Sequence, residues 1–474
     1  MNMDGLEFSQ PNKREAGSKS KMRAPPLLCF LNLLLLIVCV VSVSETGLDA
    51  RPETVRFDTG GLSRESFPKG FVFGAATSAY QVEGMASKDG RGPSIWDAFL
   101  RIPGIVASNA TAEVAADQYH RYKEDVDIMA NLNFDAYRFS ISWSRIFPDG
   151  AGKVNWKGVA YYNRLIDYML AKGITPFATI YHYDLPLALE QKYKGLLSRK
   201  VVKDYTNFAE FCFKTFGDRV KNWMTLNEPA VVSTSGYGNG GSAPGRCSKA
   251  YGNCTAGNSA TEPYIAAHNM ILCHAVAVQI YREKYQAHQK GRIGIVLDFI
   301  WYEPLTRRKA DQYAAQRAID FYLGWFLHPI VYVAKSGVPI GPRVIKITAN
   351  SAWLYDVPWS LYKVLTYIKE YYGNPTVIIT ENGMDEPGNV TLPKGLHDTR
   401  RINFYRGYLT QLKKAIDDGV NVVGYFAWSL IDTFEWRLGY TTRFGIVYID
   451  FKTLKRYPKM SAYWFRELLH RKKH

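Results

Sequence analysis

Short apolar runs that alternate with amphipathic helical stretches constrain the fold of this 474-residue chain more than any other feature. The alternation starts near residue 71 and continues without a Pro/Ser-rich linker or a block of charge, so we expect a single domain. Repeated strand and helix units predict a parallel sheet, and about eight of them predict an α/β fold of the closed (β/α)8 TIM-barrel type. The predicted strands are 71–77, 136–141, 175–181, 222–226, 293–299, 376–380 and 422–428.

One strand of the barrel is missing from this pattern. The interval between 299 and 376 should hold the sixth strand between two helices, yet it offers only the weak candidate Val-Ile-Lys-Ile-Thr at 344–348. Closing a barrel requires matched strand number and stagger, so the loss of one strand leaves strands five and seven with unpaired edges. We therefore expect a barrel that lacks the usual strand-six segment. Either 344–348 partly fills the gap or the chain folds poorly.

The first 50 residues have the pattern of a targeting segment. Basic residues precede an apolar run at 27–43, which is typical of a signal peptide, with cleavage predicted near 44–50. The alternative is an uncleaved membrane anchor, because 17 residues stand at the lower limit for spanning a bilayer. The sequence thus predicts a signal segment and short leader at 1–50 and one barrel domain at 51–474. Cleavage would route the protein through the secretory pathway, to the cell wall, the extracellular space or the vacuole, with no stable membrane partner.

A formal net charge of +16 would permit binding to nucleic acid or to another polyanion. The basic residues are spread along the chain, however, and no basic run interleaved with aromatic residues occurs outside the termini. We expect no nucleic-acid partner. The 11 Trp and 32 Tyr residues suit a cleft that stacks on or hydrogen-bonds to polar rings.

Entry into the secretory route has two covalent consequences. Cys247 and Cys254 flank a short loop and are predicted to form a disulfide, whereas Cys212 and Cys273 lie in helical patterns and are predicted to be buried free thiols. Three Asn-x-Thr sequences become candidates for N-glycosylation. Their asparagines are Asn109, Asn253 and Asn389.

Polar and aromatic residues gather at the C-terminal ends of the predicted strands, where the active site of such a barrel is built. Each of them also has a purely structural reading, for instance as a helix cap or a buried ion pair. Their convergence on one face of the barrel favours a functional role. The residues are Gln81, Glu83, Arg138, His182, Asp184, Asn227, Glu228, Glu381, Asn382, Trp428, Asp432, Glu435 and Trp436.

Two of these residues, Glu228 and Glu381, follow strands on opposite sides of the barrel. A pair of carboxyls that act as nucleophile and proton donor suits the cleavage of a glycosidic bond. The nucleophile must stay ionised, and Arg138 is the candidate cation beside it. The remaining residues would hold the sugar, by hydrogen bonds from one set and by flat apolar faces from the other. The hydrogen-bonding set is Gln81, His182, Asn227 and Glu435, and the flat faces belong to Trp428 and Trp436.

The sequence gives no sign of a metal or a cofactor. The histidines lack two-ligand spacing with carboxylates, and no His-Glu-x-x-His motif occurs. No phosphate loop or dinucleotide glycine pattern follows a strand. We expect neither a metal nor a cofactor.

The motifs resemble those of family one of the glycoside hydrolases, and within it the plant β-glucosidases. The resemblance extends over nearly all of 60–469. Its most specific pieces are FVFGAATSAYQVEG at 71–84, YRFS at 137–140, TLNEP at 225–229, ITENG at 379–383 and FEW at 434–436.

This resemblance implies a retaining mechanism, with Glu228 as acid/base and Glu381 as nucleophile. It implies sugar contacts from the two sets of residues named above, a position for Trp353 beside the aglycone, and a loop disulfide between Cys247 and Cys254. Glu228 occupies a position where plant thioglucosidases carry glutamine, which favours O-glucosides as substrates. Glu435 occupies a position that faces the outer sugar hydroxyls and differs in phospho-glycosidases, which argues against phosphorylated sugars as substrates.

The chain departs from the family pattern after WFLHP at 325–329. The family continues there with strand six and an Asn-x-Tyr-Thr motif, whose tyrosine hydrogen-bonds the nucleophile. This tyrosine has no counterpart in the sequence.

Taken with the motifs, the resemblance predicts a β-glucosidase that hydrolyses terminal non-reducing β-D-glucosyl residues of small glucosides or oligosaccharides. The alternative is a catalytically impaired splice or truncated form that acts at most as a carbohydrate-binding pseudoenzyme. A transglucosidase would carry the same motifs.

Overall fold

The structure is a computed structural model that describes residues 57–331, 349–351 and 353–471. All of these belong to the unit Glu53–His474. The predicted signal segment and the weak strand candidate at 344–348 lie outside the described residues.

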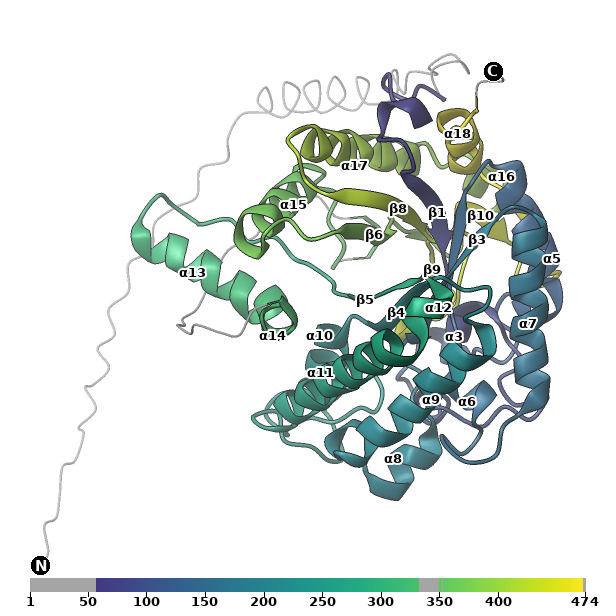
Figure 1. Ribbon diagram of the computed structural model, residues 1–474, viewed down its shortest axis with the longest axis vertical. Helices are drawn as coiled ribbons and strands as arrows, with labels where there is room; N and C mark the ends of the chain where they lie inside the picture. Colours follow the sequence, from purple (N-terminus) through teal and green to yellow (C-terminus); the bar gives the residue numbers. More distant parts are fainter. Residues whose placement is uncertain (1–56, 332–348, 352, 472–474) are drawn as a thin grey trace, which may run out of the picture. The chain divides into compact units, whose positions relative to one another are not determined.

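Seven parallel strands form the central sheet in the order β5-β4-β3-β2-β1-β8-β6. The first strand pairs with the last, so the purple β1 lies beside the yellow-green β8 in Figure 1 and the sheet curls toward a barrel. The strands are β1 (Val72–Ala76), β2 (Ala136–Ser140), β3 (Thr175–Tyr181), β4 (Asn222–Asn227), β5 (Arg292–Val296), β6 (Val377–Asn382) and β8 (Val422–Trp428). Four short strands, β7 (Glu386–Pro387), β9 (Thr442–Arg443), β10 (Val447–Ile449) and β11 (Arg456–Pro458), form two antiparallel pairs outside it.

Helices follow the strands and cover the outside of the sheet (Figure 1). The longer ones are α5 (Gln118–Asn131), α7 (Trp156–Ala171), α9 (Lys200–Phe216), α11 (Glu262–Ile280), α13 (Lys309–Ile319), α15 (Trp359–Tyr372), α17 (Thr399–Asp417) and α18 (Met460–Leu468). The shorter ones are α3 (Ala79–Val82), α4 (Ile95–Phe99), α6 (Trp143–Ile146), α8 (Leu187–Tyr193), α10 (Pro229–Val231), α12 (Gln286–Gln289), α14 (Trp325–Val331) and α16 (Leu392–Leu396).

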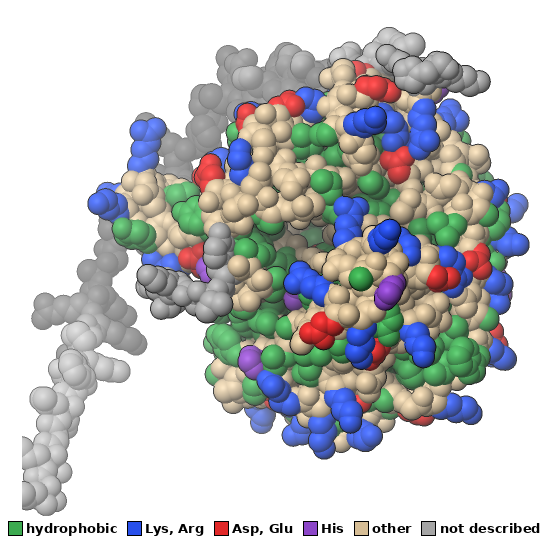
Figure 2. Space-filling model, viewed as in Figure 1, with side chains coloured by type: hydrophobic (Ala, Val, Ile, Leu, Met, Phe, Trp, Pro, Cys, Tyr) green, Lys and Arg blue, Asp and Glu red, His purple; other side chains and the backbone are tan. Residues whose placement is uncertain are grey.

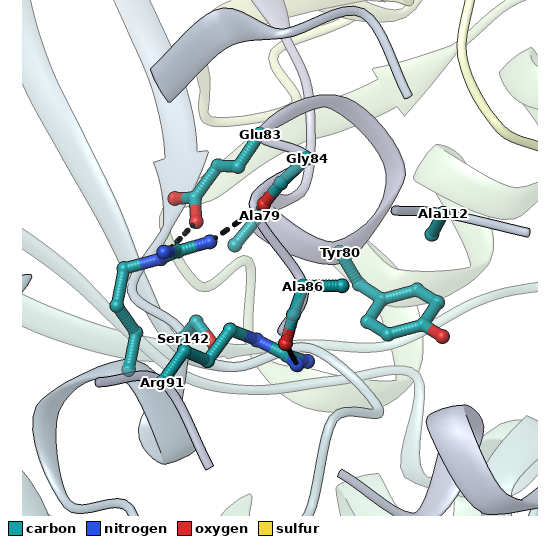
Figure 3. Close-up of a pocket in the computed structure, with 9 residues that line it drawn as sticks. Ala79, Tyr80, Glu83, Gly84, Ala86, Arg91, Ala112 and Ser142 are labelled. Atoms are coloured by element: carbon teal, nitrogen blue, oxygen red, sulfur yellow. Dashed lines mark hydrogen bonds and ion pairs between the residues drawn. The ribbon is translucent and has the colours of Figure 1, made fainter. Parts of the chain in front are cut away.

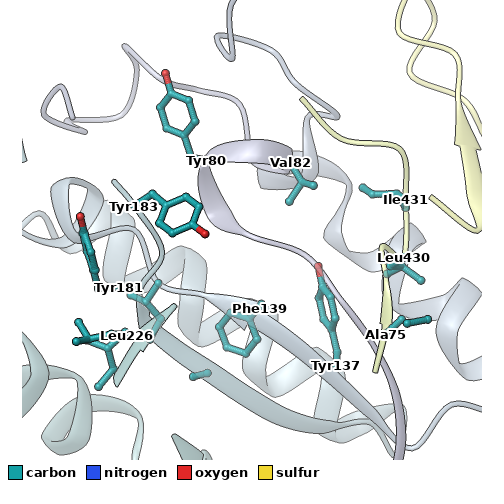
Figure 4. Packing of buried hydrophobic residues seen from close by; sticks show 14 of the residues in the cluster. Ala75, Tyr80, Val82, Tyr137, Phe139, Tyr181, Tyr183, Leu226, Leu430 and Ile431 are labelled. Atoms are coloured by element: carbon teal, nitrogen blue, oxygen red, sulfur yellow. The ribbon is translucent and has the colours of Figure 1, made fainter. Parts of the chain in front are cut away.

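The hydrophobic pattern explains where the core lies. Every residue of β2 is buried, because one face of the strand points into the barrel and the other meets the helices. Helix α9 buries Val201, Tyr205, Phe208 and Cys212 at the three- and four-residue spacing of an amphipathic helix. Figure 4 shows members of the main cluster, in which the ring centroids of Tyr137 and Phe139 lie 6.0 Å apart and Tyr181 lies farther along the same cluster. A smaller cluster fills the inside of the barrel, with Ala76, Phe177, Met224 and Phe426 among its members.

The sheet has two open edges, as the sequence predicted. Within the described residues β5 pairs only with β4, and β6 pairs only with β8. All residues of β6 are partly exposed, in contrast to the buried β2, because β6 lacks a neighbour on one side. The prediction of seven strands with unpaired edges at the fifth and seventh positions is confirmed for this part of the chain.

A helical segment at 309–331 contacts both sides of this gap. Ile319 and Leu323 pack on Tyr367 and Tyr372 of α15, which precedes β6. Phe326 packs on Ala267 of α11, which precedes β5. The segment thus covers apolar surface on either side of the gap, although it cannot supply the missing hydrogen bonds of a strand.

Candidate active site

The Arg138 guanidinium lies at the centre of the site. The side chain is fully buried, and it extends from β2 across the inside of the barrel. Nη1 donates to Glu381 Oε1, Nη2 donates to Asn227 Oδ1 at 2.6 Å, and Nε donates to Thr179 Oγ1 at 3.1 Å. This one cation therefore links its own strand, β2, to β3, β4 and β6. It contacts the predicted nucleophile directly.

Glu381 lies within β6, near its C-terminal end. Burial raises the pKa of its carboxyl, and the adjacent Arg138 charge and hydrogen bond oppose that rise. Arg138 is the only described residue that hydrogen-bonds the Glu381 carboxylate, so the ion pair alone favours its ionised form. The tyrosine that serves this position in the family pattern has no counterpart among the described residues.

Glu228 has a different environment. It follows β4 in the left-handed backbone region, at φ 40°, and it precedes Pro229, which begins α10. Its backbone N–H donates to Val296 O at 3.0 Å, which fixes the turn against β5. Burial raises the pKa of the carboxyl well above its ordinary value, and the charges of Glu381 and Asp298 raise it further. No described cation pairs with Glu228, so its neutral form is favoured.

Tyr183 was not among the predicted site residues. Its hydroxyl donates a hydrogen bond to Glu228 Oε2. The ring is buried and lies 4.9 Å from the His182 ring and 5.2 Å from the Trp436 ring, measured between centroids. The sequence offered one signal, a tyrosine directly after His182 at the end of a predicted strand, but its partner is known only from the fold, in which Tyr183 adopts a φ of 74°.

Replacing Tyr183 by Phe should move the basic limb of the kcat/KM profile to higher pH. The hydroxyl hydrogen-bonds to the ionised carboxylate and lowers the pKa of Glu228, so its loss raises that pKa and keeps the acid protonated to higher pH. The measurement is kcat/KM against pH for p-nitrophenyl β-D-glucoside. Tyr181→Phe is the matched control, because the buried Tyr181 hydroxyl has no hydrogen-bond partner in the described part of the chain. A basic limb that stays in place in Tyr183→Phe would contradict this role.

Gln81 and Glu435, predicted to hold the sugar, contact each other. Gln81 lies in α3 and donates from Nε2 to Glu435 Oε2 at 2.9 Å, and Thr433 Oγ1 donates to the same oxygen at 3.1 Å. Burial raises the pKa of Glu435 to about 8. This pair offers both donors and acceptors to a ligand with several hydroxyl groups.

His182 lies beside them after β3. Its Nε2 lies 3.3 Å from Asn227 Nδ2, while its buried Nδ1 has no hydrogen-bond partner among the described residues. Burial lowers the pKa of the imidazole well below its ordinary value, and the Arg138 charge adds to this effect. The ring is therefore neutral, and it lies buried beside Asn227.

The two predicted tryptophan faces frame the same space. The His182 ring lies nearly parallel to Trp428 and Trp436, at interplanar angles of 13° and 12° and centroid distances of 6.1 and 6.2 Å. Trp353 lies apart from them, 60% exposed, and its ring centroid is 6.3 Å from that of Phe444.

A further acidic group was missed because the sequence extended the fifth strand to residue 299. The strand ends at Val296, so Asp298 lies in the loop that follows it. The Tyr322 hydroxyl donates to Asp298 Oδ2, and burial raises the pKa of this carboxyl to about 6. Its charge acts on Glu228, which places a third carboxyl near the two glutamates.

Some of the polar residues at strand ends have structural partners instead. Glu83 pairs with Arg145 at 2.7 Å beside a buried cavity of about 10 Å³. Figure 3 shows Tyr80, Glu83 and Arg91 around that cavity, which has room for about one water molecule. Asp432 forms buried ion pairs with Arg443 at 2.6 Å and with Lys459 at 3.0 Å.

Several covalent and surface features complete this description. The predicted disulfide Cys247–Cys254 is present with a Cα–Cα distance of 5.5 Å, and Cys212 and Cys273 are free and buried, as predicted. The asparagines at the glycosylation sequences, Asn109, Asn253 and Asn389, are all exposed, and their modification stays a prediction. Figure 2 shows Lys and Arg side chains distributed over the visible face, with Asp and Glu among them.

None of the helices in the described part of the chain combines the length and the apolar character needed to cross a bilayer. Among the same residues, no group of three or more His, Cys, Asp or Glu side chains could hold a metal ion.

A parallel barrel whose strand ends carry two partly buried glutamates, one paired with arginine, defines a glycosidase class of site. The sequence model "Glycosyl hydrolase family 1" matches residues 63–339 and 340–474, and the chain belongs to this family. The break in the match falls between β5 and β6, an interval in which the described residues form no strand.

Relatives with known names agree with this assignment. The chain is 63% identical to β-glucosidase 44 of Arabidopsis thaliana over 505 residues, which cover 93% of this chain and 97% of the relative. It is 61% identical to β-glucosidase 1 of rice over 476 residues, which cover 87% of this chain and 90% of that one. The first alignment is longer than the 474 residues of this chain, so the relative contains residues that have no counterpart here.

Solved structures show the same fold. A rice β-glucosidase crystal structure is 45% identical and superimposes with a TM-score of 0.83, covering 87% of this chain and 100% of that one. A variant of the same rice enzyme, described as a covalent complex with Glc, is 44% identical with the same TM-score and the same coverage of both chains. The fold is therefore a TIM barrel of the glycosyl hydrolase type, with seven of its strands in the described part of the chain.

Proposed function

We propose that this protein is a retaining β-glucosidase that removes terminal non-reducing β-D-glucosyl residues from small glucosides or oligosaccharides. The observation that carries the proposal is the unequal environment of the two glutamates. Glu381 has a cation beside it, whereas Glu228 has none and its pKa is raised well above the ordinary value. Two carboxyls whose environments separate their pKa values are suited to opposite roles in one reaction.

In the first step, the ionised Glu381 attacks the anomeric carbon and forms a glucosyl ester, while the glycosidic bond breaks. Glu228 gives its proton to the departing oxygen, so the aglycone leaves as a neutral alcohol. Formation of the ester removes the Glu381 charge that raises the pKa of Glu228, and the acid then becomes a better base.

In the second step, Glu228 takes a proton from water, the water oxygen attacks the anomeric carbon, and Glu381 leaves as a carboxylate. The product keeps the β configuration. The relatives named β-glucosidase and the covalent complex of the rice variant support this sequence of steps by analogy. An alcohol in place of water would give transglucosylation through the same ester.

Residues around the glutamates suit the recognition of a glucosyl unit. Gln81 and Glu435 present donors and acceptors, and the neutral His182 ring lies between the two tryptophan faces and Asn227. Trp428 and Trp436 provide flat faces for the apolar side of a pyranose. We assign these residues to the sugar and Trp353, at the exposed rim, to the aglycone.

We also propose that the protein acts in the secretory route. The disulfide between Cys247 and Cys254 requires an oxidising compartment, and the exposed Asn-x-Thr sites are accessible to glycosylation.

Replacing Glu228 by Gln tests the two-step mechanism. The secreted chain should hydrolyse p-nitrophenyl β-D-glucoside, and the variant should lose about 10²- to 10⁴-fold in kcat, because water then lacks its general base. Sodium azide, which needs no base, should restore turnover and yield β-glucosyl azide. The α anomer of that product would contradict retention.

The same experiment decides between the enzyme and the pseudoenzyme. Circular dichroism establishes that the chain is folded before activity is measured. A folded wild-type chain that binds glucosides without cleaving them would contradict the proposed activity and favour the pseudoenzyme. Aggregation would instead indicate that the missing segment is required for folding.

A further inference from the structure

Asp385, four residues after Glu381, is a fully buried carboxylate with no described cation beside it. The Thr442 hydroxyl of β9 donates to its Oδ2, and the other donors come from one short stretch of chain. Oδ1 accepts from the backbone N–H groups of Asn350 and Ser351, each at 3.1 Å. Oδ2 also accepts from Ser351 Oγ at 2.5 Å and from Asn350 Nδ2 at 3.3 Å.

Asn350 and Ser351 belong to the turn that carries Trp353. The turn is closed by a hydrogen bond from Ala349 N to Leu354 O at 3.0 Å, and Leu354 N donates to Ser351 O at 3.2 Å. Asp385 therefore fixes the base of this turn, and Trp353 projects from it, 60% exposed, toward the Phe444 ring.

The acceptor character of Asp385 is what this arrangement requires. All of its partners donate, and an ionised carboxylate offers about four lone-pair sites and no donor. An amide at this position would direct its NH₂ group at donors and leave some of them unpaired in a buried place, which costs free energy. Only an ionised carboxylate satisfies the whole turn.

We propose that Asp385 is a positioning residue that holds Trp353 at the rim and thereby sets the preference for aglycones with a flat apolar ring. The proposal rests on the proposed function for its catalytic readout. Asp385 contacts neither the sugar nor the reacting atoms. It acts through the tryptophan, whose open ring face can stack on an aromatic aglycone.

Two substrates separate this role from a general structural one. p-Nitrophenyl β-D-glucoside has an aromatic leaving group, whereas β-D-glucosyl fluoride has no ring to stack. Trp353→Ala and Asp385→Asn should each lower the ratio of their kcat/KM values, aryl over fluoride, by about three- to tenfold, as expected for the loss of one ring contact. The charge of Asp385 also contributes to the raised pKa of Glu435, but that effect is on the sugar side and cancels in the ratio.

The double variant provides the sharper test. If Asp385 acts through Trp353, adding Asp385→Asn to Trp353→Ala should change the ratio no further. Multiplied effects would overturn the proposal, and so would an Asp385→Asn variant that loses activity equally on both substrates. Asp398→Asn is the control, because this buried carboxylate accepts from Ser461 and pairs with Arg401 rather than with the 349–354 turn.

Hydrogen exchange tests the same anchor without any catalysis. The amides of Asn350 and Ser351 should exchange faster in Asp385→Asn than in the wild-type chain, and Asp398→Asn should leave them unchanged. Unchanged exchange in Asp385→Asn would overturn the proposal even if the wild-type chain proved inactive, whereas a wild-type chain that cleaves neither substrate would contradict the proposed function alone. Should Asp385→Asn fail to fold, Ser351→Ala removes one donor and should lower the substrate ratio in the same direction, and an unchanged ratio would count against the anchor.

Discussion

Glu381→Gln should lower kcat/KM for p-nitrophenyl β-D-glucoside by at least about 10⁴-fold, because an amide cannot form the glucosyl ester through which both steps proceed. The variant should keep its fold. Glutamine has nearly the same size, and its amide oxygen can still accept the hydrogen bond from Arg138. Azide should not restore turnover, because the defect lies in the first step, and this outcome distinguishes Glu381→Gln from Glu228→Gln.

Glu435→Gln is the matched control for this loss. It is also a buried glutamate at the site, but it contacts Gln81 and Thr433 rather than Arg138. We expect this substitution mainly to raise KM, since it removes an acceptor for sugar hydroxyls and leaves the nucleophile in place. Residual turnover of Glu381→Gln within tenfold of the wild-type value would show that another group attacks the sugar.

The fold could be predicted from the sequence to the extent that it depends on local pattern. The strand predicted at 175–181 matches β3, and the strand predicted at 422–428 matches β8, because both are apolar runs buried on each face. The fifth strand was predicted to end three residues too late, at 299 rather than at Val296. Leu297 and Phe299 are apolar like a strand, but they pack in loop conformation against the segment at 309–331.

The site could be predicted where a chemical argument selected the residues. Two glutamates at strand ends and a buried arginine in a third strand satisfy a requirement of the reaction, and the structure brings Arg138 and Glu381 into contact. The residues that hydrogen-bond to Glu228 and to the turn of Trp353 were missed for a common reason. Tyr183 and Glu228 lie 45 positions apart, and Asp385 meets a turn 34 positions before it, so neither pair leaves a local pattern in the chain.

The open edge of β6, as seen in the described residues, gives the contact between Arg138 and Glu381 a second role. β6 pairs only with β8 in the described residues, and its other edge is open. The Arg138 side chain crosses the inside of the barrel from β2 to β6. The ion pair therefore fixes the position of the end of an edge strand, and it also stabilises the negative charge of Glu381. In a closed barrel a neighbouring strand would share that task. The geometry of the nucleophile therefore depends on this cation for position and for ionisation alike.

Arg138→Met should accordingly lower kcat/KM at pH 6 by about 10²- to 10³-fold, the loss typical for removal of one preorganised charge or donor. Without the cation, burial raises the pKa of Glu381 unopposed, so the nucleophile ionises only at higher pH. The acidic limb of the kcat/KM profile should then move to higher pH. In Tyr183→Phe the basic limb is the one that moves, so the two variants change different limbs of the profile. Arg138→Lys keeps the charge but not the fork that meets Thr179 and Asn227, and it should restore the acidic limb more than the rate. An acidic limb that stays in place in Arg138→Met, in a chain shown to be folded by circular dichroism, would mean that Glu381 does not depend on Arg138 for its charge.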